Sequence, residues 1–242
     1  MWEMYDALLN QVKTDDRIQY VRVGDSWVLV KTESGALGVA VVQNGKAGLP
    51  LSTDQYAGMS LNEAAELVKS WDFEKASFGL AAINTIFNQS DRFPDCGEPD
   101  AFLRYRDRAE GKKVGVVGRF PYLEKRLKPI CRLSVLERTP HAEDYPDSAC
   151  EYILPEMDIV FITGCTISNK TLPRLLQLSQ NAYTIITGPS TPMSEVMFDF
   201  GVDALCGFCV TDEKGGILAA EDRQAIFTCG RMVCLEKNNI GA

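Results

Sequence analysis

Three short loops in the sequence carry the residue types that could bind a small ligand. They read "VVGRFP", "ITGCTISNKTLP" and "ITGPSTP". In each, glycine ends an apolar run, polar or charged residues follow, and a proline stands at or near the first turn of a predicted helix. Glycine lets backbone N–H groups approach a ligand, and helix N-termini favour negative charge. One such loop would be explained by a tight turn, whereas three at one edge favour a site for an anionic molecule.

The apolar runs before these loops predict the elements that position them. "KVGVVG", "CRLSVLE", "DIVFITG", "YTIITG" and "ALCGFCV" are short and almost continuously apolar. Such runs are typical of strands buried on both faces of a parallel sheet, and predicted helices separate most of them. The alternation predicts a Rossmann-like, doubly wound α/β domain with a mainly parallel sheet. Parallel strands end at one edge, where open α/β folds bind ligands.

The first part of the chain predicts a different unit. A helix over 1–12 precedes three predicted strands, and two helices follow, which indicates a small α+β domain. The predicted strands are Ile18–Val23, Trp27–Lys31 and Leu37–Val42. Residues 91–111 are rich in charges, proline and glycine and are interpreted as a linker with an exposed helix. We therefore predict two domains, residues 1–95 and 96–242.

Composition excludes several classes of function. The 242 residues carry a formal net charge of −8 and are 45% hydrophobic. A general nucleic-acid or anionic-membrane binder needs a basic face, so neither partner is expected. No apolar run reaches the roughly 18–20 residues of a membrane span, and the N-terminus does not resemble a signal peptide. We therefore expect a cytoplasmic protein.

The cysteines and the single histidine give little support for a metal cage. The eight cysteines stand mostly in apolar runs and are expected to be reduced. Cys206 and Cys209 form C-x-x-C, a loose echo of zinc-ribbon spacing, but "ALCGFCV" reads as a strand whose positions three apart face opposite sides. His141 is the only histidine and has no identifiable nucleophile beside it, so no catalytic residue is assigned.

The first loop partly matches a dinucleotide-binding fingerprint. "GVVGRFPYL" contains Gly115 and Gly118 but lacks the full G-x-G-x-x-G spacing. Glu137 ends the next predicted strand, about where a ribose-binding acid would stand, and a solvated strand end would explain it equally well. NAD or S-adenosylmethionine is therefore a weaker candidate as cofactor.

Several stretches resemble a known family. "GRFPYL", "VLERTP", "YPDSACEYILPEMDIVFITGCTISNKTL" and "GPSTPMSEVMFDFGVDALCG" resemble the DUF364 family, labelled as a heavy-metal chelation domain. "SFGLAAINTIFNQ" is similar to the end of the DUF4213 domain that precedes it. The resemblance implies an N-terminal domain like that of enolase, a Rossmann-like C-terminal domain and a site in the cleft between them.

The resemblance also implies the residues of that site. They lie in the strand-end loops and in one helix of the first domain: Asn84, Gly118, Arg119, Phe120, Glu137, Gly164, Cys165, Thr166, Asn169, Thr171, Gly188, Pro189, Ser190 and Thr191. Cys165 departs from the family pattern, in which threonine or serine is expected, and adds a soft donor. Asn84 either reaches the cleft or caps a neighbouring backbone.

Specific roles are expected for three of these residues. Gly188–Pro192 is expected to form one wall of the cleft opposite Gly118–Phe120, and the side chains of Ser190 and Arg119 are expected to lie outside the core. Thr191 is a natural N-cap before Pro192. Arg119 is expected to pair with an anionic group of the ligand.

The leading hypothesis is a cleft that binds, and in one version modifies, a small anionic molecule such as a metal chelator or its complex. A metal held within an organic chelate fits the residues better than a bare ion. The alternatives are a nucleotide-dependent enzyme and a non-catalytic protein that binds a metal chelate. Association of identical chains is left open. The absorbance of a purified sample or a thermal-shift screen of cofactors would separate the nucleotide-dependent enzyme from the rest.

Overall fold

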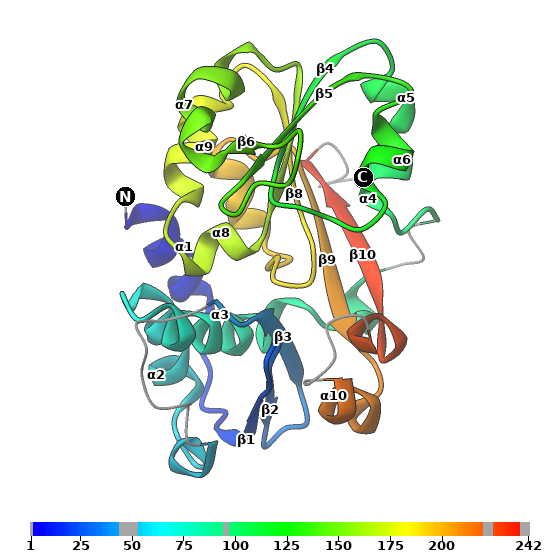
Figure 1. The fold of residues 1–242 in the computed structure, drawn as a ribbon. Helices are drawn as coiled ribbons and strands as arrows, with labels where there is room; N and C mark the ends of the chain where they lie inside the picture. The colour runs from blue at the N-terminus through cyan, green and yellow to red at the C-terminus, as the bar shows by residue number, and fades with distance from the viewer. Residues whose placement is uncertain (1, 44–52, 94–96, 220–224, 238–242) are drawn as a thin grey trace.

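The computed structural model describes residues 2–43, 53–93, 97–219 and 225–237. Two lobes, stacked in Figure 1, are called the N-terminal lobe (residues 2–93) and the C-terminal lobe (residues 97–237). In these ranges no helix is both long enough and apolar enough to cross a bilayer.

The N-terminal lobe is built on a three-stranded antiparallel sheet in the order β1-β2-β3. The strands lie within one residue of the predicted bounds: β1 (Ile18–Val23), β2 (Trp27–Thr32) and β3 (Leu37–Val41). Around the sheet lie the helical elements α1 (Glu3–Gln11), η1 (Thr53–Tyr56), α2 (Leu61–Glu66), η2 (Leu67–Lys69), α3 (Phe73–Phe87) and η3 (Ser90–Arg92). Helix α3 is apolar on most sides and buried along most of its length, as that composition requires. It packs closely on β3 at Gly38, where a Cβ would lie 2.2 Å from Ala81 O.

The C-terminal lobe contains a seven-stranded sheet in the order β10-β9-β8-β7-β4-β5-β6. Its strands are β4 (Lys113–Val117), β5 (Arg132–Glu137), β6 (Tyr145–Pro146), β7 (Ile159–Thr163), β8 (Tyr183–Thr187), β9 (Ala204–Val210) and β10 (Gly230–Glu236). Every neighbouring pair is parallel except β9 and β10. This confirms the predicted mainly parallel sheet, separate from the antiparallel one. The strand order reverses at β4, which lies between β5 and β7.

Helices cover both faces of this sheet, as in a doubly wound fold (Figure 1). The helical elements of the lobe are α4 (Ala101–Arg104), α5 (Arg106–Ala109), α6 (Leu123–Leu127), η4 (Asp147–Ala149), α7 (Cys150–Ile153), η5 (Leu154–Glu156), α8 (Cys165–Ser168), α9 (Leu172–Leu178), η6 (Glu195–Phe200), α10 (Glu213–Ala219) and η7 (Ala225–Thr228). Helices α4, α5 and α6 pack on one face, and α7, α9 and η6 contribute to the core on the other.

Two parts of the C-terminal lobe differ from the sequence predictions. Residues 91–111 were interpreted as a linker with an exposed helix, but Phe102 and Tyr105 are buried against the parallel sheet. The interpretation is wrong there because it followed the many charged residues of the segment. It overlooked these two aromatic residues, whose side chains face the sheet. Strand β10 was not predicted; it pairs along its whole length with β9.

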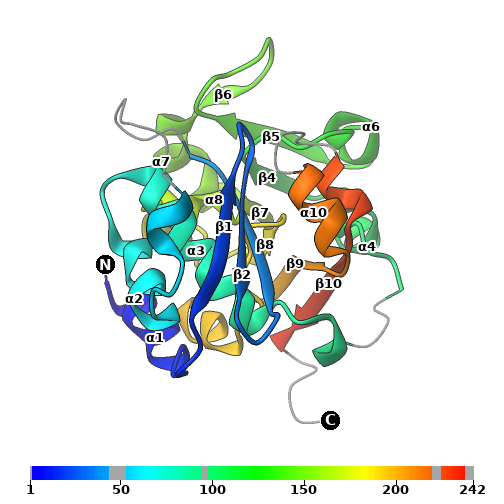
Figure 2. The same ribbon diagram turned by 90° about the horizontal axis from the view of Figure 1, so that it is seen from below.

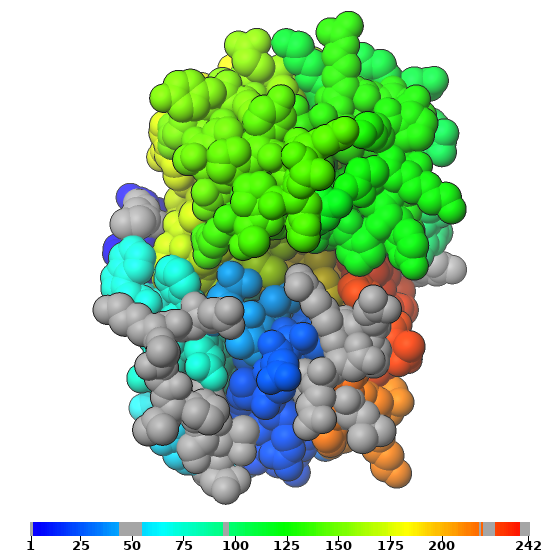
Figure 3. Space-filling view, viewed as in Figure 1, coloured from blue at the N-terminus to red at the C-terminus, as the bar shows by residue number. Residues whose placement is uncertain are grey.

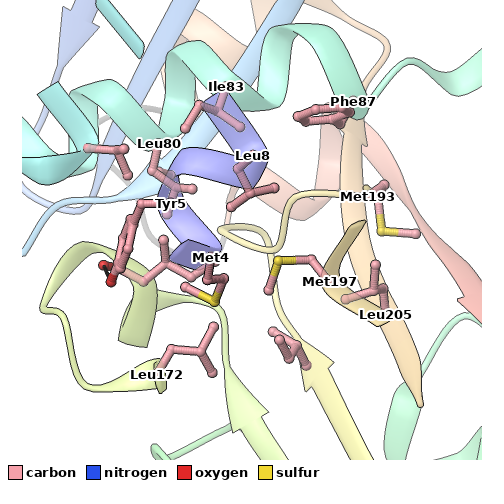
Figure 4. Close-up of a cluster of buried hydrophobic side chains, with 14 of the residues drawn as sticks. Met4, Tyr5, Leu8, Leu80, Ile83, Phe87, Leu172, Met193, Met197 and Leu205 are labelled. Carbon is pink, nitrogen blue, oxygen red and sulfur yellow. Dashed lines mark hydrogen bonds between the residues drawn. The ribbon is translucent and has the colours of Figure 1, made fainter. Parts of the chain in front are cut away.

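The N-terminal lobe covers the edge of the parallel sheet at which β7 and β8 end. Seen from below, the antiparallel sheet lies in front of these strand ends (Figure 2). Apolar side chains from both lobes join one core, in which Tyr5, Leu8 and Ile83 meet Leu172 and Met197 (Figure 4). Helix α10 of the C-terminal lobe also contacts the N-terminal lobe: its Glu213 forms an ion pair with Nζ of Lys31 on β2 at 2.7 Å. The candidate loops therefore lie between the lobes.

Candidate functional site

The loops after β4 and β7 touch each other at the reversal of strand order. Gly118 begins the first loop with φ +97°, and a Cβ there would lie 2.8 Å from Thr163 Cγ2. The N–H of Gly118 donates to Leu136 O at 2.9 Å, which fixes the turn against β5. In open α/β sheets the reversal of strand order is where ligands bind, outside the carboxyl ends of the strands. Thr163 lies at this point but was not predicted, although its place as the last strand residue before Gly164 would have marked it.

Arg119 follows Gly118 and is already balanced by two carboxylates. Its Nη1 donates to both carboxylate oxygens of Asp144, at 2.8 and 2.7 Å, and its Nη2 pairs with Glu124. The Asp144 side chain is 5% exposed, whereas that of Arg119 is 33% exposed, so water reaches the guanidinium but hardly the carboxylate. The hydrogen bond that Arg119 donates to Asp144, followed by the charges of both acids, raises the pKa of Arg119. An anionic ligand would have to compete with these carboxylates for the guanidinium.

Glu137 ends β5 and holds the Arg119 loop through backbone contacts. Its Oε2 accepts a hydrogen bond from Arg119 N at 2.7 Å, and its Oε1 accepts one from Arg138 N at 2.7 Å. A carboxylate that accepts two backbone N–H groups fixes a turn without help from a ligand. Its role as a ribose-binding acid stays a prediction.

The loop after β7 packs directly against the loop after β8. A Cβ at Gly164 would lie 2.6 Å from Thr191 N, so only glycine lets the two loops approach. Cys165 is half-buried, and its Sγ lies 3.7 Å from Ser190 Oγ. The thiol and the hydroxyl therefore sit side by side where the loops meet.

Three further polar residues of this loop make local contacts. Thr166 is buried, and its hydroxyl donates to Thr163 O at 2.7 Å. Asn169 Oδ1 accepts hydrogen bonds from Thr171 N at 3.2 Å and from Thr171 Oγ1 at 2.6 Å, an Asx-type turn that leads into α9. These contacts shape the loop, and among the described residues no hydrogen bond joins these three side chains to the other predicted loops.

Gly188 brings the loop after β8 next to the loop after β4. It has φ +106°, and its N–H donates to Cys206 O at 3.0 Å. A Cβ at Gly188 would lie 3.6 Å from Phe120 Cε1, so the half-buried ring of Phe120 faces this glycine. Pro189, the next residue, is buried. The two loops predicted to oppose each other are thus in contact.

Ser190 and Thr191 lie in the core between the lobes, so the expectation that the Ser190 side chain lies outside it is wrong. Ser190 is 1% exposed, and its Oγ accepts a hydrogen bond from Val41 N at 2.9 Å. Thr191 is fully buried, and its Oγ1 has no hydrogen-bond partner within the described residues. Thr191 is not an N-cap either, because the helical turn η6 begins at Glu195, after Ser194.

Asn84 and Asn88 contact the backbone from the same helix end. Asn84 Nδ2 donates to Val39 O at 2.8 Å, whereas its buried Oδ1 has no partner among the residues that the structure describes. Asn88 was not predicted, although it lies one helical turn beyond Asn84. Its side chain joins the lobes through three hydrogen bonds: to Thr191 O at 2.9 Å, to Phe208 O at 3.1 Å and from Met193 N at 3.0 Å.

Lys170 is a buried cation that sequence reasoning missed. It is 7% exposed, with φ +68°, and its Nζ donates to Ser168 O at 2.6 Å. The ammonium lies 5.8 Å from the ring centre of Tyr5 and 5.7 Å from that of Phe73, both in the N-terminal lobe. Burial lowers the pKa of Lys170 to about 8. Its position in the loop after β7 was the available signal.

A cavity of about 440 Å³ lies beside Arg119, on the side of α6 and β5. Its lining combines charged and apolar side chains: Arg119, Glu124, Lys128, Cys131, Leu133, Val135, His141, Ala142, Glu143 and Asp144. Arg119 is the one predicted site residue in this lining. A separate furrow runs between the two lobes on the face shown in Figure 3, with atoms coloured as the loops after β7 and β8 at its floor.

No metal cage is present in the part of the chain that the structure describes. No three side chains of histidine, cysteine, aspartate or glutamate gather there into a group that could hold an ion. The seven described cysteines are in the thiol form and not in disulfides, and Cys96 lies outside the described residues. Cys206 and Cys209 contribute to core clusters on opposite faces of the sheet, as their spacing predicts. The two cysteines of the C-x-x-C pair therefore cannot bind the same metal ion.

Comparison with known proteins identifies two family models in the chain. Residues 100–221 match DUF364 and residues 5–87 match DUF4213, and both models carry the description "Putative heavy-metal chelation". An uncharacterized protein of Methanocaldococcus jannaschii is 30% identical over 202 residues, which cover 80% of this chain and 78% of that protein.

Solved structures show the same arrangement of lobes. A DUF364 protein of unknown function from Desulfitobacterium hafniense is 38% identical, with a TM-score of 0.90 over 98% of this chain and 99% of that one. A DUF364 protein from Pyrococcus horikoshii is 21% identical, with a TM-score of 0.74 over 96% of this chain and 98% of that one, and supports the fold. The chain belongs to the DUF364 family, with a DUF4213 segment before the DUF364 segment.

Proposed function

We propose that the protein binds a small anionic metal chelator, or the metal complex of one, where the loops after β4, β7 and β8 meet between the lobes. The observation that carries the proposal is the contact of three glycines with neighbouring loops. Gly118 lies against Thr163, Gly164 against Thr191 and Gly188 against Phe120. Glycine at each contact keeps side chains out of the strand ends, so a ligand there would meet the side chains of the neighbouring loops. The N–H groups of the three glycines themselves donate to Leu136 O, Thr187 O and Cys206 O.

The half-buried residues at this place supply complementary chemistry. Phe120 offers an aromatic surface, and Cys165 offers a soft sulfur donor next to the Ser190 hydroxyl. The unpartnered Oγ1 of Thr191 adds a buried polar atom whose hydrogen-bonding capacity is unused among the described residues. Arg119 supplies positive charge if its contacts with Asp144 and Glu124 yield to a stronger anion.

The side chains at this place suit recognition of a metal chelate better than direct binding of a bare metal ion. Within the described ranges the chain offers no group of three ligating side chains, whereas tight protein sites for heavy metals use three or four. An organic chelator would supply those ligands itself, and the protein would then need only to recognise the outside of the complex. This role is compatible with the description that the matched families carry.

Calorimetric titration tests the proposal with defined probes. Citrate should be titrated alone and with Cu²⁺ or Ni²⁺, next to the bare ions, NAD⁺ and S-adenosylmethionine. The proposal requires that citrate or its complex binds more tightly than the bare ion. Tight binding of NAD⁺ or S-adenosylmethionine alone would instead identify a nucleotide-dependent enzyme. If none of these probes binds, a wider screen of anionic chelators by thermal shift must yield one, or the proposal fails.

Arginine substitutions then locate the bound anion. Arg119→Ala should weaken binding roughly 10- to 100-fold, because a hydrogen bond to a charged group contributes about 1.5–3 kcal/mol. Arg174→Ala is the matched control, since Arg174 pairs with Glu151 at 2.5 Å on the exposed surface of α9. Equal affinity of both variants for the chelate would remove Arg119 from the site.

A further inference from the structure

Two cysteines face each other across the last pair of strands in the C-terminal sheet. Cys206 on β9 is in register with Cys234 on β10, and their Sγ atoms are 3.0 Å apart. The ladder bonds of this pair of strands fix the geometry. Lys237 N donates to Asp203 O, and Thr211 N donates to Cys229 O; in each case the two residues lie directly opposite each other. Hydrogen-bonded pairs alternate along antiparallel strands, so they fall at the odd-numbered residues of β9. Cys206 and Cys234 therefore form a non-hydrogen-bonded pair, in which directly opposite side chains lie closest.

This backbone geometry permits a disulfide without movement of the strands. Non-hydrogen-bonded pairs have Cα atoms about 4.5 Å apart, which lies within the range of about 4.4–6.8 Å seen for disulfides. Two thiols already in contact need only a change in side-chain torsion to bring the sulfurs to bonding distance. Cys209, three positions along β9, faces the opposite side of the sheet and cannot take the place of Cys206.

The two thiols differ in their access to solvent. Cys206 is fully buried, whereas Cys234 is half-buried on β10, the strand that ends the sheet. A small oxidant reaches Cys234 first, and the buried partner is then in position to resolve the oxidised sulfur. An accessible thiol beside a resolving thiol is the arrangement found in redox-sensitive cysteine pairs.

The pair also lies directly behind the candidate loop. Cys206 O accepts the hydrogen bond from Gly188 N at 3.0 Å, so one peptide unit links the buried thiol to the turn after β8. Glu236, on the same strand as Cys234, pairs with Arg104 of α4 at 3.0 Å.

We propose that Cys206 and Cys234 are a reversible dithiol–disulfide pair, oxidised by hydroperoxides. The Cys234 thiolate attacks the terminal peroxide oxygen and the O–O bond breaks. A sulfenic acid results, together with hydroxide from hydrogen peroxide or an alkoxide from an alkyl hydroperoxide. The Cys206 sulfur then attacks the sulfenic sulfur, the S–S bond forms, and the hydroxyl group leaves with the proton of the Cys206 thiol as water. Two electrons pass from the two sulfurs to the peroxide, and a small dithiol reductant returns both thiols.

Peptide mapping tests the pair directly. Reduced protein is treated with one equivalent of hydrogen peroxide, alkylated and digested with trypsin without reduction. The expected product joins peptide 175–214 to peptide 232–237 with the loss of two hydrogen atoms, and dithiothreitol should release it. Overoxidation of Cys234 without a link, or a link that resists the reductant, would overturn the proposal.

Serine variants assign the partner, because peptide 175–214 contains both Cys206 and Cys209. Cys209→Ser should retain the link, and Cys206→Ser should abolish it and leave sulfenic acid on Cys234, detectable with dimedone. Loss of the link in Cys209→Ser alone would assign the wrong thiol and refute the proposal. If a variant fails to fold, fragmentation of the wild-type cross-linked peptide between positions 206 and 209 makes the same assignment.

Discussion

The N–H of Val41, at the end of β3, donates a 2.9 Å hydrogen bond to Ser190 Oγ, in the loop after β8. This bond joins the antiparallel sheet to the edge of the parallel sheet across 149 positions of sequence. Both residues are buried, with exposures of 9% and 1%, so water does not replace the bond if it is lost.

Ser190→Ala should therefore destabilise the protein by about 1–3 kcal/mol, because it leaves a buried N–H unpaired. Ser179→Ala is the matched control. Ser179 is also 1% exposed, but its Oγ has no partner among the described residues, so its removal should change the free energy of unfolding by about 0.5 kcal/mol or less. Urea unfolding of both variants measures the difference, and equal losses would show that the Val41 bond contributes nothing.

Asn88→Ala should cost about 3–5 kcal/mol, since it removes three buried hydrogen bonds that connect the lobes. Asn84→Ala makes the same change one helical turn earlier, where the amide donates a single bond to Val39 O. It should cost only about 1–2 kcal/mol. Chemical denaturation ranks the two variants, and a larger loss for Asn84→Ala would contradict this assignment of the contacts.

Gly118→Ala should destabilise the protein by about 2–4 kcal/mol. A positive φ costs about 1 kcal/mol for alanine, and the new Cβ also meets Thr163 Cγ2 at 2.8 Å. Gly35→Ala tests the backbone cost alone, because Gly35 has φ +95° with no atom near the new Cβ. Thr163→Ser should recover part of the loss in the Gly118→Ala background but not in the wild type. Additive effects in this double-mutant cycle would rule out the contact.

Lys170 should give the protein a stability that depends on pH in the alkaline range. Its pKa is about 8 when folded and near 10.5 when unfolded, so the unfolded chain binds more protons between these values. The destabilising cost of burying the charged ammonium is fully present below pH 8 and is relieved as pH rises to 10.5. The relief amounts to at most about 3 kcal/mol, and the cation–π contacts with Tyr5 and Phe73 reduce it.

The check compares the wild type with Lys170→Met. The difference in unfolding free energy, wild type minus variant, should rise between pH 8 and 10.5 and stay flat between pH 6 and 7.5. The subtraction cancels the titration of buried cysteines such as Cys150 and Cys209, whose pKa values burial raises to about 12. A flat difference over the whole range would mean that the folded protein keeps Lys170 charged up to its ordinary pKa.

Local sequence patterns predicted much of the fold because most of its strands are short, continuous apolar runs that can be recognised without knowledge of distant residues. Runs such as Ile159–Thr163 and Tyr183–Thr187 are apolar throughout, as strands buried on both faces must be. Strand β10 was not predicted because its apolar stretch spans only residues 232–235, between the charged Arg231 and Glu236, as is usual on a sheet edge. The edge position, and not the local pattern, makes that segment a strand.

The candidate site was less predictable because its environment comes from distant parts of the chain. The sequence placed Ser190 in a polar loop, but β3 covers that loop and turns its hydroxyl into an interior acceptor. Asn88 ends an apolar helix and gives no local sign that it bonds to Thr191 and Phe208. Lys170 likewise gains its aromatic surroundings only when α1 and α3 pack over it.

The apolar core that runs through both lobes makes the protein one cooperative unit. Tyr5, Leu80 and Ile83 pack in the same cluster as Leu172 and Met193 (Figure 4), and among the described residues both core clusters of the N-terminal lobe are shared with the C-terminal lobe, so the N-terminal lobe has no interior of its own. Detaching the N-terminal lobe would expose an inner surface of α1 and α3 that is as apolar as any core. Heat or urea should therefore melt both sheets in a single transition, and residues 1–93 expressed alone should aggregate.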